Sequence, residues 1–399
     1  MTIAYFSNFL NHHQKVVADI LAATEGIEYT FVETVPMYEW LKNDGYSDFS
    51  QVSYVLRAWE SQEAYAMAIE LAQSVDVALF GGPEVLKFEV LRAKCTNKLS
   101  FEVSERWLKR GWVNLFSPRL LKSLWYYHTL FKKKPIYKLC SSAFGAVDQY
   151  KLNTYIGKCY KWGYFTAVDE NFDVKENVEK HSSEVIHLMW CSRFLTLKHP
   201  ELPIMLANIL KEKHYSFRLD MYGSGEKLEA SKDLVSHLKL DSVVSFRGNM
   251  PNQDLLQEMR NHQIFLFTSD QNEGWGAVAN ESMSNGCVIV GSDAIGSVPF
   301  LVKDKVTGLI YRSANKNTGF KSRILTIDKD ALQSLSLNVE WLLNNPEQRK
   351  RIAINAYENM CQIWSPANAA KNLLTLINCL LNNKETSIYE GPCSKALPI

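Results

Sequence analysis

Short apolar runs alternate with segments of helical hydrophobic periodicity along the whole chain. Apolar runs bounded by turn residues predict buried strands, and apolar positions repeating every three or four residues predict helices. The predicted strands are 2–6, 27–33, 75–80, 98–103, 135–140, 157–164, 184–190, 217–222, 243–246, 264–267 and 288–290. The predicted helices are 15–23, 53–74, 141–150, 201–211, 254–260, 277–285, 328–343, 346–360 and 366–381. This alternation predicts an α/β protein with parallel sheets, whose ligands lie beyond the carboxyl ends of the strands.

One of the predicted strand–helix–strand units contains a glycine-rich loop. The apolar run 264–267 leads through this loop into the helical segment 277–285, and a second apolar run follows at 288–290. This order is typical of a βαβ unit. Gly274 and Gly276 let a ligand approach bare backbone, and the start of the helix offers free N–H groups to an anion.

Two carboxylates flank this loop. Glu273 stands just before the predicted helix start, and Glu281 follows about two helical turns further along. Acids on either side of an anion site suggest a ligand with both hydroxyls and phosphates, such as a nucleotide-sugar. The alternative is that Glu273 caps the helix and Glu281 is solvated.

The spacing of these acids matches a known motif. Glu273 and Glu281 resemble the E-x7-E motif of the family-4 retaining glycosyltransferases, which have the GT-B fold. The pair Ser292-Asp293 and the sequence VTGLIY at 306–311 fit the same pattern. The resemblance covers residues 184–381 well and the first half more loosely.

Two basic residues lie in the loop after the strand 184–190. Arginine offers a rigid fork for two phosphate oxygens, whereas lysine is a mobile point charge. Arg193 and Lys198 match the R-x4-K of the family, which grips the diphosphate of the donor. Gly223 and Gly225 resemble its G-x-G turn, although a lone G-x-G also occurs simply to make a turn.

The resemblance implies a GT-B architecture in the α/β class. Two Rossmann-like doubly wound domains would face a cleft, and a C-terminal helix would cross back to the first domain. The expected parts are an acceptor-side domain at 1–168, a linker at 169–183, a nucleotide-sugar domain at 184–362, a crossover helix at 363–381 and a mobile tail at 382–399.

The resemblance also implies the reaction and the residues that perform it. A hexosyltransferase of this type moves a sugar from a UDP- or GDP-type donor to a glycan or a lipid-linked saccharide, in bacterial-type surface polysaccharide or glycolipid synthesis. It keeps the anomeric configuration, and the departing phosphate takes the proton of the acceptor, so that no enzyme nucleophile, cofactor or metal is required. The expected catalytic residues are Arg193, Lys198 and Glu273. The expected donor-binding residues are Gly274, Trp275, Gly276, Ala277, Val278, Glu281, Gly223, Gly225 and Asn249.

Polar side chains also follow strands of the first half. Asn8 and His13 lie in the loop after the first strand, where many family members have a glycine-rich loop that this chain lacks. We therefore expect contacts to sugar hydroxyls or to the acceptor rather than to phosphate. Glu105 and Asp148 are further acceptor-side candidates. The alternatives are a helix cap with surface histidines for the first loop, and a solvated acid for Glu105.

The segment 106–138 interleaves basic and aromatic residues and contains no acid. Such a segment fits a helix lying on anionic lipid, and lipid-linked acceptors are common among similar glycosyltransferases. The alternative is an ordinary helix whose aromatics fill the core while its cations face water.

Composition narrows the classes of function. The chain has 399 residues, with 44 Lys and Arg against 43 Asp and Glu, which argues against a protein that works mainly by binding nucleic acid. Eight cysteines lack metal-ligand spacing, and no signal peptide or bilayer-length apolar run is present, so we expect a cytoplasmic protein, at most peripheral to the inner face of the membrane. The acidic pair in Asp328-Lys329-Asp330 is expected to cap a helix rather than to bind metal.

Three other functions fit the sequence. The chain could be a nucleotide-sugar epimerase or another enzyme of this fold without an acceptor. It could also be a non-catalytic subunit that binds sugar nucleotides. A scaffold on a lipid surface is the third.

Overall fold

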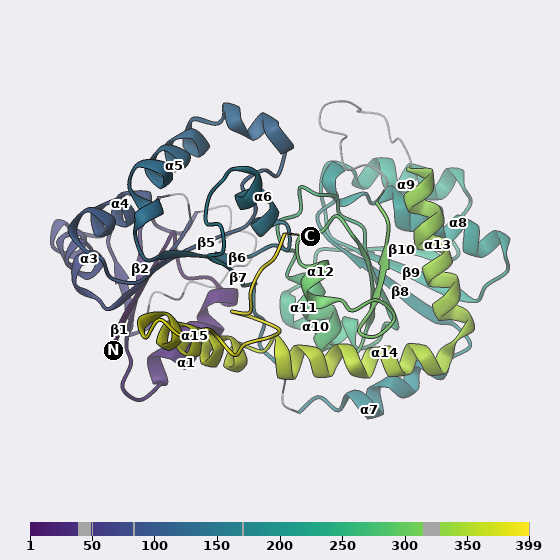
Figure 1. Cartoon of the computed structure of the whole chain (residues 1–399). Coiled ribbons are helices and arrows are strands. Elements are labelled where there is room, and N and C mark those ends of the chain that lie inside the picture. Colours follow the sequence, from purple (N-terminus) through teal and green to yellow (C-terminus); the bar gives the residue numbers. More distant parts are fainter. Residues whose placement is uncertain (39–48, 50, 83, 170, 314–327, 399) are drawn as a thin grey trace. The chain divides into compact units, whose positions relative to one another are not determined.

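A computed structural model describes residues 1–38, 49, 51–82, 84–169, 171–313 and 328–398 of the chain. It divides into two compact units, Met1–Ala167 with Ile363–Ile399, and Val168–Gln362. Each unit is built on its own parallel sheet (Figure 1). Among the described helices, none combines the length and hydrophobicity that crossing a bilayer requires.

The sheet of unit 1 has seven parallel strands in the order β3-β2-β1-β4-β5-β6-β7. The strands are β1 (Thr2–Ser7), β2 (Glu28–Glu33), β3 (Val55–Arg57), β4 (Val77–Gly81), β5 (Ser100–Ser104), β6 (Ile136–Cys140) and β7 (Cys159–Lys161). The helices are α1 (His12–Ala23), α3 (Gln62–Ser74), α4 (Leu86–Cys95), α5 (Pro118–Thr129), α6 (Gly145–Lys151) and α15 (Pro366–Leu381). All five residues of β4 are buried, as expected for a central strand with helices on both faces.

The predicted helix 53–74 is wrong in its first part. Its apolar residues fit a helical period, but Val55 pairs with Phe31 and extends the edge of the sheet as β3. The helix begins only after Ser61, whose hydroxyl accepts a hydrogen bond from the Ala64 N–H at 3.0 Å. A serine at this position satisfies an N–H group that the first turn leaves unpaired.

The end of the chain belongs to unit 1. The helix α15 packs on α1, as Figure 1 shows for the yellow and purple helices. Residues 391–396 then run beside β7. The Lys161 N–H donates to the Ser394 carbonyl, and the Cys393 N–H donates to the Lys161 carbonyl. Cys393 and Ser394 are buried. The expectation of a mobile tail is therefore corrected for residues 391–396, because strand pairing and burial hold them.

The sheet of unit 2 has six parallel strands in the order β10-β9-β8-β11-β12-β13. They are β8 (Ile186–Cys191), β9 (Phe217–Tyr222), β10 (Val244–Gly248), β11 (Ile264–Phe267), β12 (Val288–Ser292) and β13 (Leu309–Tyr311). The helices are α7 (Val174–Asn177), α8 (Glu201–Glu212), α9 (Leu228–His237), α10 (Asn252–Met259), α11 (Val278–Ser284), α12 (Val298–Leu301), α13 (Lys329–Asn344) and α14 (Pro346–Glu358). These two doubly wound parallel sheets confirm the predicted fold class.

The segment 169–183 is not a free linker. It forms α7 and a 3₁₀ turn at Val178–Ser182, and Val174 and Val178 are buried in the core of unit 2. The sequence pattern favoured a linker because these two valines are surrounded by charged residues and form no apolar period.

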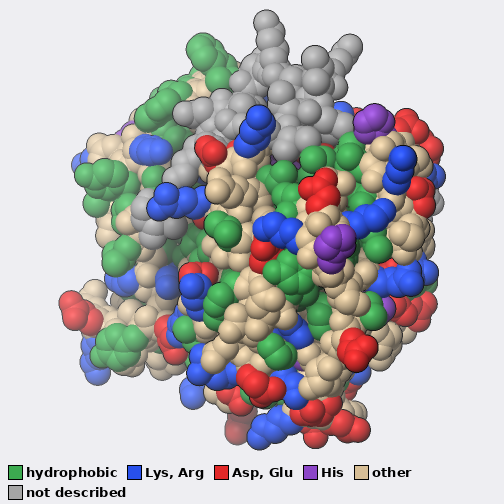
Figure 2. Space-filling model, turned by 90° about the vertical axis from the view of Figure 1, so that its right-hand side faces the viewer, with side chains coloured by type: hydrophobic (Ala, Val, Ile, Leu, Met, Phe, Trp, Pro, Cys, Tyr) green, Lys and Arg blue, Asp and Glu red, His purple; other side chains and the backbone are tan. Residues whose placement is uncertain are grey.

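The surface of unit 2 carries both signs of charge. Figure 2 shows Lys and Arg side chains intermixed with Asp and Glu across one face of the molecule, in keeping with the net charge of +1. That face offers no extended surface of a single sign.

Candidate donor site at the carboxyl edge of the second sheet

The predicted catalytic residues lie in two adjacent loops. β8 and β11 are neighbours in the sheet, and the strand order runs outward in opposite directions from them. Ligands in open parallel sheets bind where the order reverses in this way. The loop after β8 carries Arg193 and Lys198, and the loop after β11 carries Glu273.

The structure brings Lys198 and Glu273 into direct contact. The Lys198 ammonium pairs with Glu273 Oε2, and both side chains are only 13% exposed. The Ser269 hydroxyl donates to the same oxygen at 3.0 Å. A charge-assisted bond in a mostly desolvated position is strong and holds both groups in one orientation.

Thr268 fixes the backbone around this pair. Its hydroxyl donates to the Lys198 carbonyl at 2.8 Å and accepts from the Trp190 indole N–H at 2.9 Å. The Asp270 N–H donates to the Leu197 carbonyl at 2.9 Å. The two loops are therefore joined through backbone as well as side chains.

His199 strengthens the same connection and was missed by the sequence analysis. Its ring lies 2.8 Å from Glu201 Oε1 and 3.5 Å from Asp270 Oδ2. Burial alone would lower its pKa, but hydrogen bonds to Asp270 and Glu201 raise it to about 9. The residue also has a φ of 49°, a left-handed conformation that non-glycine residues seldom adopt. The available signal was a histidine next to the motif lysine, with an acid two residues later at Glu201.

We expect His199→Gln to lower stability in a pH-dependent way. Because the folded pKa is above the unfolded value of about 6.5, the protonated ring stabilises the fold fully below that pH. The stabilisation is lost as the pH rises through about 9. Urea unfolding at pH 6, 7.5 and 9.5 should give a difference on the order of 1–3 kcal/mol at pH 6 that shrinks toward zero at pH 9.5. A pH-independent difference would contradict the charged pairing.

The G-x-G turn after β9 packs against the arginine loop. Phe194 N–H donates to the Ser224 carbonyl, and Lys227 N–H donates to the Phe194 carbonyl. At Gly223, a Cβ atom would lie 2.0 Å from the Ser192 carbonyl oxygen, and at Gly225 a Cβ would lie 2.6 Å from that of Phe194. Glycines are therefore needed here for the backbone to approach the loop.

The arginine of this loop lies beside the turn. Arg193 is exposed, and no described residue accepts a hydrogen bond from its guanidinium. Asn249 Nδ2 donates to the Ser224 hydroxyl at 3.1 Å, so the loop after β10 joins the same edge. The structure thus groups Asn249, the turn and Arg193.

The loop before α11 is shaped by a tryptophan and a glycine. Trp275 is buried, and its indole N–H donates to Asn280 at 2.9 Å. Gly276 has a φ of +77°, and a Cβ there would lie 2.3 Å from the Phe267 ring. Ala277 provides no side-chain cap for the helix that starts at Val278. The Ala279 N–H donates to the Gly276 carbonyl at 3.1 Å, which leaves the neighbouring N–H groups of the first turn for another acceptor.

Glu281 is not solvated. It is buried in α11, where Asn252 Nδ2 donates to its Oε1 at 3.1 Å. Burial raises the pKa of the Glu281 carboxyl, and the Asn252 hydrogen bond opposes that shift. The structure excludes the alternative of an exposed surface acid for Glu281, and it adds Asn252, which no sequence motif marked.

In unit 1, two of the acceptor-side candidates lie close together. His13 stacks on Tyr164 with ring centroids 5.5 Å apart, and the Tyr164 hydroxyl donates to Glu105 Oε1 at 2.8 Å. Burial and the neighbouring His12 lower the pKa of His13 to about 3, so its ring is neutral at pH 7.

Asn8 lies at the corresponding edge of the first sheet. The strand order reverses between β1 and β4, and Asn8 follows β1 while Gly82 follows β4. A Cβ at Gly82 would lie 2.7 Å from Asn8 Oδ1. That oxygen is buried, and no described residue donates to it.

Asp148 has a different position from the one expected. It is fully buried, forms an ion pair with Arg106 at 3.0 Å and accepts from the Leu108 N–H at 2.8 Å. Its oxygens therefore anchor the segment after β5. This arrangement does not favour the predicted contact to an acceptor.

The geometry agrees with a comparison of the sequence with known families. Residues 171–359 match the family model described as glycosyl transferases group 1. This part of the chain belongs to that family. The group 1 domain spans the two loops with Arg193, Lys198 and Glu273 and includes Glu281.

One curated relative matches a shorter part of the chain than the family model does. Poly(glycerol-phosphate) alpha-glucosyltransferase of Bacillus subtilis (strain 168) is 28% identical over 137 residues, which are 34% of this chain and 19% of that protein. The matched part therefore spans about a fifth of that relative.

Solved structures resemble the whole chain. A glycosyltransferase from Rickettsia africae ESF-5 has a TM-score of 0.63 and 16% identity, covering 96% of this chain and 99% of its own. Anabaena Alr3699/HepE in complex with UDP has a TM-score of 0.66 and 13% identity, covering 95% and 100%. This likeness concerns the fold, and it agrees with the predicted GT-B architecture of a group 1 domain joined to a second doubly wound domain.

Proposed function

We propose that this protein is a retaining glycosyltransferase that moves a hexose from a nucleoside diphosphate sugar to a glycan or lipid-linked saccharide. The observation that carries the proposal is the Lys198–Glu273 pair, which lies in the two loops where the strand order of a group 1 domain reverses. In this pair, Lys198 would bind phosphate and the adjacent Glu273 would bind sugar hydroxyls. Surface polysaccharide or glycolipid synthesis, at the inner face of the cytoplasmic membrane, is the setting that fits such a reaction.

The leaving diphosphate needs stabilisation as negative charge grows on it. Lys198, the exposed Arg193 and the uncapped start of α11 supply positive charge and N–H donors for that purpose. The acceptor hydroxyl attacks the anomeric carbon from the face that the diphosphate leaves, and the departing phosphate oxygen takes its proton. The configuration is kept without an enzyme nucleophile.

The two acids orient the donor. Glu273 binds hydroxyls of the transferred sugar, and Glu281 binds the ribose hydroxyls. The scheme uses protein cations where other enzymes use a metal. Asp328, the first acid of the Asp-Lys-Asp sequence, accepts hydrogen bonds from Asp330 N–H and Ala331 N–H at the start of α13, the position of a helix cap.

Incubation of the purified full chain with UDP- and GDP-sugars tests the proposal. UDP is present in the HepE complex, so UDP-sugars come first, and a polyol-phosphate polymer joins the acceptor panel because of the Bacillus relative. We expect nucleoside diphosphate release that depends on acceptor, and an α-linked product from an α-linked donor. An isomerised sugar nucleotide without acceptor would indicate an epimerase, and tight donor binding without turnover would indicate a non-catalytic subunit.

We also propose that unit 1 contacts an anionic membrane surface. Within the segment 106–138, Trp112, Phe116 and Trp125 are 57%, 85% and 60% exposed. Cations accompany them on the same segment. The exposed ones are Arg110, Arg119, Lys122, Lys132 and Lys133. Aromatic and basic side chains exposed together fit the interface of an anionic bilayer.

Other residues of this segment are buried in unit 1. Tyr127 and Phe131 are buried, and Lys138 is fully buried, where it pairs with Glu102 and donates to the Ser104 hydroxyl at 2.8 Å. The proposed membrane surface is therefore limited to exposed residues that precede α5, lie on it or follow it as far as Lys133. The segment therefore contains residues that serve the core of unit 1 and exposed residues on which the membrane proposal rests.

Replacement of Trp112, Phe116 and Trp125 by Ser is expected to abolish flotation with vesicles of phosphatidylcholine and phosphatidylglycerol. Wild type should float with these vesicles and not with phosphatidylcholine alone, because each cation adds about 1 kcal/mol near an anionic surface. A matched control replaces Trp59, Met67 and Tyr389, which are also exposed. Equal flotation of both triple variants would contradict the assignment.

A further inference from the structure

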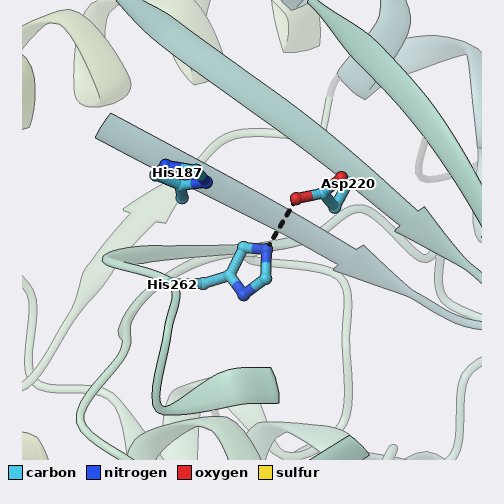
Figure 3. A group of neighbouring side chains, drawn as sticks. All are labelled: His187, Asp220 and His262. Carbon is cyan, nitrogen blue, oxygen red and sulfur yellow. Dashed lines mark hydrogen bonds and ion pairs between the residues drawn. The ribbon is translucent and has the colours of Figure 1, made fainter. Parts of the chain in front are cut away.

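Three metal-ligand side chains converge in unit 2 away from the donor loops. His187 comes from β8, Asp220 from β9 and His262 from the segment before β11 (Figure 3). One ligand atom from each residue lies within 4.8 Å of the others. His187 is the second residue of its strand, whereas the donor loops follow the opposite, carboxyl ends. The proposed transfer reaction uses none of the three.

The hydrogen bonds of His262 define which ring nitrogen faces the cluster. Its Nδ1 lies 2.7 Å from the Glu258 carbonyl oxygen, which can only accept, so Nδ1 carries a proton. Its Nε2 lies 3.0 Å from Asp220 Oδ2 (Figure 3). In the singly protonated ring, a lone pair on Nε2 would face a carboxylate oxygen. This contact requires a positive charge between the two atoms, supplied by a proton or by a metal ion.

Both carboxylate oxygens of Asp220 have defined neighbours. Arg247 Nε donates to its Oδ1 at 2.7 Å, which leaves Oδ2 directed at His262. Neighbouring ligand atoms of a tetrahedral ion with bonds of about 2.0–2.1 Å lie roughly 3.3 Å apart. The separation of 3.0 Å between nitrogen and oxygen is close to this spacing.

The position of His187 favours a metal ion over a proton as the positive charge between His262 and Asp220. Its ring lies 5.9 Å from that of His262, at an interplanar angle of 84°. His187 donates its backbone N–H to Gln263 Oε1 at 2.6 Å, whereas no described residue hydrogen-bonds to its ring, and the partly exposed side chain gives an ion a route from solvent. A simple imidazolium–carboxylate pair between His262 and Asp220 has no need of His187, whereas a metal needs a third ligand.

We propose that His187, Asp220 and His262 bind a divalent transition metal of the Zn²⁺ class, with water in the remaining position. Two imidazoles and one carboxylate suit Zn²⁺ rather than Mg²⁺ or Ca²⁺. The Nδ1–H bond of His262 to a backbone carbonyl is the outer contact that metal-bound histidines make. The ion joins β8, β9 and the segment before β11, so its role is to stabilise unit 2.

Cobalt titration of the full-length, tag-free protein after EDTA dialysis tests this site. We expect about one Co²⁺ per chain, visible absorption bands of a tetrahedral site, and displacement by Zn²⁺. We also expect Zn²⁺ to raise the melting temperature by roughly 5 °C. Because all readouts are binding and stability, failure here leaves the proposed transfer reaction untouched, and absence of transfer leaves this site untouched.

His187→Gln is the deciding variant, because its partly exposed side chain can change without leaving a buried charge unpaired. It should lose the cobalt spectrum and the Zn²⁺ shift while its melting temperature in EDTA matches that of wild type. His237→Gln, an exposed histidine on α9, should behave as wild type. Wild type without stoichiometric binding, or His187→Gln with undiminished binding, would overturn the proposal in favour of a protonated His262–Asp220 pair.

Discussion

Lys198→Ala is expected to lower sugar transfer by about 10²–10³-fold and to remove the thermal shift that the donor produces. The ammonium supplies positive charge where the diphosphate develops its negative charge. The change also leaves Glu273, which is 13% exposed, beside the diphosphate without its cation. Turnover with saturating donor and differential scanning fluorimetry with and without donor measure the two effects.

The control is Lys232→Ala, which removes an exposed cation of α9. It should leave both measurements unchanged. Lys198→Ala without ligand also needs a melting curve, because loss of the ion pair costs some stability. A folded Lys198→Ala protein that still shows the full donor shift would remove the basis for the diphosphate assignment.

Gly223→Ala is expected to destabilise unit 2 by about 3 kcal/mol or more and to lower donor affinity. The added methyl would lie 2.0 Å from the Ser192 carbonyl oxygen, and the residue has a φ of +121°. The turn must then move away from the loop that carries Arg193. Urea unfolding gives the stability, and calorimetric titration with the donor gives the affinity.

Gly248→Ala is the control that separates the cost of backbone strain from the cost of a steric clash. Gly248 also has a positive φ, +71°, but a Cβ there would meet nothing within 4 Å. We expect a cost of about 1 kcal/mol, from backbone strain alone. Equal losses for the two variants would show that the close approach at Gly223 does not matter.

Where chemistry and spacing are local, motifs in the sequence group the residues of the candidate donor site. Arg193 and Lys198 stand in one loop, and Glu273 and Glu281 flank another, so a motif describes each pair. The contact between Lys198 and Glu273 follows from strand order, because β8 and β11 become neighbours only in the sheet. No motif marked His199, because one partner, Glu201, begins α8 and the other, Asp270, lies in the distant loop after β11.

The errors share a physical cause, which is tertiary contact outweighing local pattern. β3 forms because an exposed edge of β2 offers hydrogen bonds to residues that also fit a helix. Asp148 was expected to face an acceptor and Lys138 belonged to a segment of exposed cations, yet each pairs with an opposite charge inside unit 1. Burial of a charge depends on its partner, and the partner is distant in sequence.

The strand-like segment 391–396 and α15 have a consequence for synthesis of the protein. Unit 2 is continuous and can fold as soon as the ribosome has released it. Unit 1 begins first, but its helix α15 and the segment beside β7 are missing until residues 363–396 have been made. Chaperones that recognise exposed apolar surface should therefore bind the nascent amino-terminal half longest, and C-terminal truncation should harm that half rather than the donor domain.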